Sequence, residues 1–107
     1  MTGSGRLVGL DVGTSSVKGL AIDDSGAVLA SASRAVALST PQPGWAEQDP
    51  EDWWMAASAV LDELGAADAD GIGLTGQMHG LVVLGADDRP LRPAMLWNDG
   101  RTQRECE

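Results

Sequence analysis

The stretch Leu7–Asp23 constrains the fold more than any other part of the chain, because it predicts two strands around one polar bend. Two short runs rich in Val, Leu and Ile, Leu7–Val12 and Val17–Ile22, flank the bend Gly13–Ser16. Runs of this length and composition, separated by a Gly/Ser/Thr cluster, are typical of a hairpin. We therefore expect the fold to begin with two antiparallel strands.

The end of the first run is a candidate site because a carboxylate interrupts it. Asp11 lies among apolar residues, and a buried carboxylate without a cation, hydrogen bonds or water is costly. Gly13 lets the backbone approach a ligand closely, and successive N–H groups in such a bend can hold an anion. The pattern favours a nucleotide-phosphate site beside a metal, although simple turn hydrogen bonding by Asp11 and Thr14 explains the same residues.

Length, charge and cysteine content exclude several classes of protein. A chain of 107 residues is one domain or part of one. The net charge of −9 argues against binding to nucleic acid or to anionic membranes. The single cysteine, Cys106, allows no internal disulfide. We find no membrane-spanning run and no signal peptide, which predicts a cytoplasmic protein, and we expect residues 1–5 to be a disordered or tag-like terminus.

The next part of the chain predicts a third strand and a loop. Ala27–Leu38 is rich in small and β-branched residues, and it would complete a three-stranded antiparallel meander. Ser39–Asp49 contains two prolines and a glycine, so we expect an irregular loop. Trp45 in this loop is expected to pack inward as an anchor.

A helix is predicted over residues 50–64. Asp49 fits the N-cap, the proline that follows it fits the first helical position, and Gly65 fits the stop. Apolar residues recur at helical spacing along this segment. The adjacent Trp53 and Trp54 are expected to pack in the core.

The final third of the chain predicts more short strands. Apolar runs at Gly71–Thr75, Leu81–Leu84 and Ala94–Trp97 are interpreted as strands, and Thr102–Glu107 as a first helical turn. Strands, a helix and further strands give a mixed α/β (α+β) fold class.

Polar clusters follow two of these strands. Gln77–Gly80 contains the only histidine, His79, and its glycine-framed position suits a site held by a rigid scaffold. A structural histidine at a strand end fits that position equally well. In the later cluster, Asp99 and Arg101 are expected to form an internal ion pair, which leaves Asn98 free to meet a ligand.

Four segments in order, DVGTSSVKG, GWAEQDPEDWW, GLTGQMHGLVVL and RPAMLWNDGR, resemble the xylulokinases of the FGGY carbohydrate kinase family. The resemblance runs from about Leu7 to the end of the chain. It implies the actin-like, ribonuclease-H-like ATPase fold, with residues 6–107 as an incomplete N-terminal kinase domain. Family members are several times longer, and their catalytic-base aspartate and adenine-binding half lie downstream of the residues matched here.

The resemblance also implies roles for individual residues. Asp11 is expected to matter for activity and to lie near Mg²⁺, directly or through water. Lys18 falls where the related glycerol kinases place an arginine near the phosphates. The ATP phosphate-binding residues implied are Gly13, Thr14, Ser15, Ser16 and Lys18, and the substrate-binding residues implied are Gln77, Met78, His79 and Asn98.

The function implied is that of an ATP-dependent D-xylulose 5-kinase with Mg²⁺ and ATP, of which this chain would be the N-terminal segment. The segment alone is expected to be inactive, and the full-length enzyme could form a homodimer. A related gluconate kinase, and a non-catalytic interaction module or pseudo-enzyme that kept half of the site, are the other interpretations. The sugar-side motif Gln77–Gly80 argues against a third, a different actin-like ATPase such as a chaperone.

Overall fold

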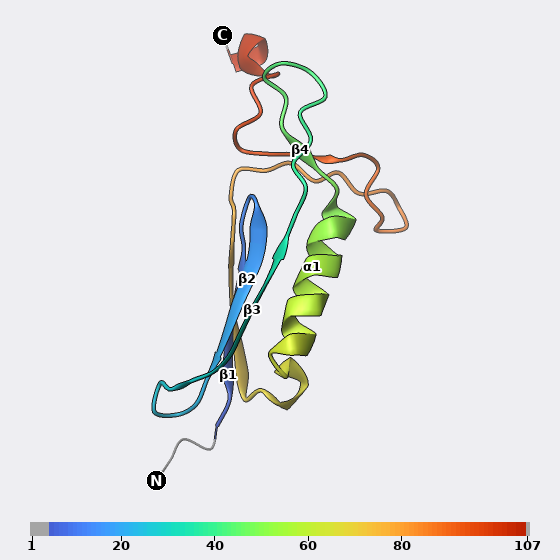
Figure 1. The fold of residues 1–107 in the computed structure, drawn as a ribbon. Helices are drawn as coiled ribbons and strands as arrows, with labels where there is room; N and C mark the ends of the chain where they lie inside the picture. Colours follow the sequence, from blue (N-terminus) through green and yellow to red (C-terminus); the bar gives the residue numbers. More distant parts are fainter. Residues whose placement is uncertain (1–4, 107) are drawn as a thin grey trace.

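The computed structural model describes residues 5–106, so the prediction for residues 1–4 lies outside the described part of the chain. Its first three strands are β1 (Leu7–Val12), β2 (Ser16–Ile22) and β3 (Val28–Ala35). Each is antiparallel to the one before it, which confirms the predicted meander (Figure 1). The turn between β2 and β3 is fastened by Asp23, whose Oδ1 accepts hydrogen bonds from the backbone N–H groups of Ser25 and Ala27.

A fourth strand joins the other side of β1. β5 (Gly71–Gly76) pairs with β1 in parallel, in register from Leu7 opposite Gly71 to Val12 opposite Gly76. The strand order of the sheet is therefore β3-β2-β1-β5. Because the paired strands run in the same direction, the segments that follow β1 and β5 emerge at the same edge of the sheet.

The helix α1 (Pro50–Glu63) supplies the crossover to β5 and covers one face of the sheet (Figure 1). The predicted cap is confirmed, because the Asp49 side chain accepts a hydrogen bond from Glu51 N at 3.0 Å. Gly65 adopts the left-handed backbone, with φ 67°, that a helix stop favours. The core between helix and sheet is made of small and branched apolar side chains, among them Val8, Leu10, Val17, Ala21, Val60 and Leu64.

The helix approaches β2 so closely that only glycine fits at position 19. A Cβ atom there would lie 2.5 Å from Leu64 Cδ1 and 2.7 Å from Val60 Cγ1, well inside van der Waals contact. The close packing of the core therefore requires a residue without a side chain at position 19, as well as the apolar residues around it.

Trp53 and Trp54 differ in their surroundings. Trp53 is half-buried and packs against the core, as predicted, whereas Trp54 is 68% exposed, and the prediction that it packs in the core was wrong. Consecutive helical residues point about 100° apart, so one face of α1 cannot bury both rings.

A second, two-stranded sheet pairs β4 (Glu47–Gln48) with β6 (Ala94–Met95). The prediction of an irregular loop over Ser39–Asp49 was therefore wrong at its end, where the chain finds a partner segment distant in sequence. The predicted strand Leu81–Leu84 is also wrong, since only its first and last residues form single bridges. The facing segment contains prolines, which cannot donate to a strand ladder.

Two short 3-10 helices complete the fold: η1 (Ala66–Asp68) and η2 (Gln103–Cys106). The second lies within the predicted helical turn. Over residues 5–106, no helix has both the length and the apolar character needed to cross a membrane.

Candidate functional site

The parallel pairing of β1 with β5 brings the two polar segments singled out in the sequence to one edge of the sheet. The bend Gly13–Ser16 follows β1, and the loop Gln77–Gly80 follows β5. They are joined at their bases, because Gln77 N donates to Val12 O at 3.0 Å. The carboxyl ends of parallel strands are a common place for ligands, since loops meet there on a rigid support.

Asp11 is exposed, so the expectation of a buried carboxylate was wrong. Side chains alternate along a strand, and the neighbours of Asp11 face α1 while Asp11 itself points to the uncovered face. The register places Lys18 of β2 on one side of Asp11 and Thr75 of β5 on the other. All three line one shallow hollow on this face.

The bend itself offers donors. Gly13 N donates to Ser16 O at 3.0 Å, which closes the turn. Among residues 5–106, the backbone N–H groups of Thr14 and Ser15 have no protein acceptor. Free N–H groups on successive residues suit the oxygens of an anion such as phosphate.

The described residues contain no group of three or more His, Cys, Asp or Glu side chains that could hold a metal ion. Mg²⁺ is commonly held by one or two carboxylates together with water and substrate phosphates. A single exposed carboxylate, Asp11, beside the bend fits this kind of binding and does not fit a cage made only of protein ligands.

The loop after β5 holds a strained residue. His79 has φ 61°, a left-handed conformation that is uncommon for a residue other than glycine. Such conformations concentrate at ligand sites, where the surrounding structure enforces them. His79 lines a hollow with Gln77 and Trp53, whereas Met78 lies outside that hollow with 71% of its surface exposed.

The third cluster contributes a tryptophan that the sequence interpretation missed. Trp97 Nε1 donates to Thr14 Oγ1 at 3.2 Å, so the segment after β6 contacts the bend. Asn98, the predicted ligand residue beside it, is exposed. No sequence signal linked Trp97 to the bend, because the two residues are far apart in the chain.

Gln48 was also missed, although its side chain bonds the bend, the helix α1 and the loop after β5. It is 1% exposed, and its amide bonds the Thr14 carbonyl oxygen, the Trp53 indole and the Gln77 side chain. Gln77 in turn accepts a hydrogen bond from Thr14 Oγ1 at 3.4 Å. A lone polar residue before a helix cap gives no sign of this role in the sequence.

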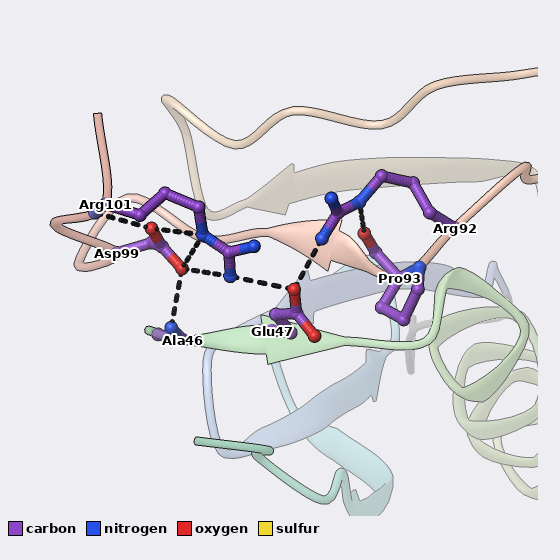
Figure 2. A network of polar contacts seen from close by, with 6 residues as sticks. All are labelled: Ala46, Glu47, Arg92, Pro93, Asp99 and Arg101. Carbon is purple, nitrogen blue, oxygen red and sulfur yellow. Dashed lines mark hydrogen bonds and ion pairs between the residues drawn. The ribbon is translucent and has the colours of Figure 1, made fainter. Parts of the chain in front are cut away.

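An ion-pair network holds the segment that contains Asp99 and Arg101 against β4 (Figure 2). The predicted pair of Asp99 with Arg101 is confirmed, with Oδ2 and Nη2 2.6 Å apart. Arg101 Nη2 also reaches Glu47 Oε2 at 2.7 Å, and Arg92 binds the same oxygen. The Arg101 guanidinium lies 3.6 Å from the centre of the Trp45 ring, so Trp45 does pack inward, against a cation.

The ion pair of Asp99 with Arg101 shifts the pKa of both partners toward their charged forms. Hydrogen bonding to Arg101, aided by the backbone N–H of Ala46, holds the pKa of Asp99 well below its usual range. The same contact raises the pKa of Arg101. Both groups are therefore charged at neutral pH, and they fix the 94–101 segment against β4.

Fold and site together define the class of protein. The fold is the start of the actin-like, ribonuclease-H-like fold of sugar kinases: a mixed sheet with a helix on one face and a polar bend between its first two strands. The chain belongs to the FGGY family of carbohydrate kinases, whose N-terminal domain model matches residues 6–107.

Three of the similar proteins are carbohydrate kinases that are much longer than this chain. The xylulose kinase of Klebsiella pneumoniae is 45% identical over 104 residues, which cover 94% of this chain and 22% of that enzyme. A Brucella ovis structure described as a xyloylose kinase is 46% identical, with a TM-score of 0.86 over 94% of this chain and 22% of its own. A gluconate kinase from Lactobacillus acidophilus is 31% identical, with a TM-score of 0.87 over 94% of this chain and 21% of its own. The chain thus spans about a fifth of the length of these relatives.

Proposed function

We propose that this chain is the N-terminal part of an ATP-dependent kinase that phosphorylates D-xylulose. The observation that carries the proposal is the meeting of the bend Gly13–Ser16 with the loop Gln77–Gly80 at one edge of the sheet. It is supported by relatives named xylulose kinase at 45% identity. A kinase must hold a phosphate donor and an acceptor side by side, and two adjoining polar loops provide that arrangement.

The bend would hold ATP phosphates. The unpaired N–H groups of Thr14 and Ser15 would meet phosphate oxygens, and the hydroxyl of Ser16 and the side-chain ammonium of Lys18 would add to this contact. The exposed carboxylate of Asp11 would orient Mg²⁺ or its bound water. When bound, Mg²⁺ neutralises phosphate charge during transfer.

The sugar would lie on the other loop. Gln77 and His79 line the hollow beside Trp53, and their polar atoms match the hydroxyl groups of a small sugar. Met78, which follows Gln77, and Asn98, which follows Trp97, are both exposed and would be free to contact the sugar. The carbon chain of xylulose would be held by these contacts while its terminal hydroxyl faces the phosphate.

The reaction transfers one phosphoryl group. The bond between the γ-phosphorus of ATP and the bridging oxygen breaks, phosphorus bonds to the sugar oxygen, and the proton of that hydroxyl passes to a base. The resemblance assigns the base to an aspartate in the later part of the family's chain. The residues present here bind and orient donor and acceptor, and they do not supply the base.

The test is a coupled ADP-release assay on the full-length protein that carries this chain, with Mg·ATP and D-xylulose, and with gluconate as the competing substrate. The proposal expects ADP release that depends on xylulose and a higher kcat/KM for xylulose than for gluconate. A higher kcat/KM for gluconate would instead make the protein a gluconate kinase, which is the activity named for one of the similar structures from Lactobacillus acidophilus. No sugar-dependent ADP release would favour the non-catalytic module.

A further inference from the structure

Gln48 is the most enclosed polar residue near the candidate site, with 1% of its surface exposed. Its amide forms three hydrogen bonds to three different elements. Nε2 donates to the backbone oxygen of Thr14 in the bend at 2.5 Å. Oε1 accepts from Trp53 Nε1 of α1 at 2.8 Å and from Gln77 Nε2 of the loop after β5 at 3.2 Å.

The partners of Gln48 require an amide with one orientation. The Trp53 indole can only donate, and the Thr14 carbonyl can only accept. The amide oxygen must therefore face Trp53, and its nitrogen must face Thr14. A glutamate of the same length would keep the acceptor but lose the donor, and an apolar side chain would leave both partners without a hydrogen bond.

A second path links the same two loops, so the contacts form a closed ring. Thr14 Oγ1 donates to Gln77 Oε1 at 3.4 Å, and Gln77 donates back to Gln48. Trp97 adds a hydrogen bond to Thr14 from outside the ring. Within the described part of the chain, no buried side-chain nitrogen or oxygen lacks a partner. A fully satisfied network of this kind favours a single arrangement of the loops that it joins.

We propose that Gln48 is a positioning residue that fixes the bend Gly13–Ser16 relative to the loop Gln77–Gly80. The inference rests on the proposed function, which assigns the first segment to ATP phosphates and the second to the sugar. Gln48 is buried and bonds the backbone oxygen of Thr14 and the side chain of Gln77. It can therefore act on the substrates only through these two loops. Small errors in the distance between donor and acceptor reduce transfer strongly.

If this alignment is lost, part of the ATP should be hydrolysed by water without phosphorylating the sugar. When the sugar hydroxyl is correctly placed, the γ-phosphorus bonds to its oxygen and ADP leaves. When it is misplaced, water can supply the oxygen instead, the P–O bond to ADP still breaks, and the product is inorganic phosphate. The ratio of sugar phosphate formed to ADP released therefore measures alignment, and it does not depend on the fraction of protein that is folded.

The experiment compares Gln48→Glu with wild type in the full-length protein. This change keeps the size and the acceptor, removes the donor to Thr14, and sets a carboxylate oxygen against the Thr14 carbonyl. We expect turnover to fall by about tenfold or more, and the yield of sugar phosphate per ADP to fall below the wild-type value. The matched control is Gln42→Glu, which makes the same charge change at an exposed residue of the preceding loop and should leave both quantities unchanged.

Trp53→Phe provides a second route if Gln48→Glu does not fold by circular dichroism. It keeps an aromatic ring in the helix but removes the donor that orients Gln48, and it should lower the same ratio. A ratio that stays at the wild-type value in the folded variants would overturn the role of Gln48 alone. A wild-type protein that releases no ADP in response to sugar would overturn the proposed function, and this inference with it.

Discussion

At the scale of single residues, Asp11 and His79 are the two side chains whose placement is hardest to explain by stability. Asp11 is exposed on the uncovered face of the sheet, in register with Lys18 and Thr75. His79 holds a left-handed backbone that most side chains avoid. Neither residue contributes to the core, so the substitution of each tests function with little effect on folding.

Asp11→Asn in the full-length protein should reduce kcat by about a hundredfold or more, because the charge that we propose to orient Mg²⁺ is lost where negative charge develops. Circular dichroism should be unchanged, since the side chain is exposed and its shape is kept. The matched control is Asp24→Asn, an exposed carboxylate in the turn after β2. Near-normal turnover of Asp11→Asn at saturating Mg·ATP would contradict the role given to Asp11.

His79→Ala should raise the KM for D-xylulose, because a lost hydrogen bond to a bound hydroxyl costs about 1–3 kcal/mol. The KM for ATP should change less. His79→Asn distinguishes the effect of losing the imidazole from the effect of backbone strain. Asn also lacks the imidazole, but it tolerates the left-handed conformation. A raised KM in both variants supports contact with the sugar; normal values in both would make the histidine structural.

At the scale of elements, local patterns predicted most of the helix and the meander. The cap Asp49, the stop Gly65 and the hairpin of two apolar runs around a polar bend are signals within a few residues, and each was confirmed. The pairing of β1 with β5 and of β4 with β6 joins segments distant in sequence. No local pattern encodes such partners, and the same reason explains why Gln48 was missed and why Leu81–Leu84 was wrongly predicted as a strand.

The packing of α1 on β2 gives a stability prediction. Gly19→Ala places a methyl group 2.5 Å from Leu64 and 2.7 Å from Val60, so it should lower the free energy of unfolding by about 1–3 kcal/mol. Gly9→Ala is the control, because a Cβ atom at Gly9 has no other atom within 4 Å. The midpoint of urea unfolding should fall only for Gly19→Ala, and equal effects of both changes would contradict the close approach of the helix.

The ion-pair network gives a pH prediction. Arg101 lowers the pKa of Asp99 in the folded state, so this carboxylate stabilises the fold at neutral pH and down to its unfolded pKa of about 3.9. That contribution declines as the pH falls below this value, because the unfolded state then takes up the proton more readily. Asp99→Asn should therefore destabilise the chain at pH 7 and less so at pH 2–3, measured by thermal unfolding.

The control for this experiment is Asp62→Asn, which changes an exposed carboxylate on the helix. It should show little difference from wild type at either pH. An Asp99→Asn defect that stays constant from pH 7 to pH 2 would show that the carboxylate charge is not what stabilises the segment.

At the scale of the whole molecule, one part of the sheet carries apolar side chains that the helix does not cover. Leu74 is 73% exposed and Ile72 53% exposed on β5, beyond the part of the sheet that α1 covers. The matched kinases are between four and five times longer, since the chain covers 22% of them. We still expect this segment alone not to phosphorylate sugar, because a base must come from elsewhere in a kinase of this family.

If residues 6–106 form half of a sugar kinase site, they should work in place of the matching segment of a related enzyme. These residues would replace the matching segment of the Klebsiella pneumoniae xylulose kinase, which is 45% identical. The chimera is assayed for ADP release with Mg·ATP and D-xylulose, beside the same chimera carrying Asp11→Asn. We expect xylulose-dependent turnover that the Asp11→Asn change abolishes. A folded chimera without turnover, or one in which Asp11→Asn has no effect, would show that these residues do not form such a half-site.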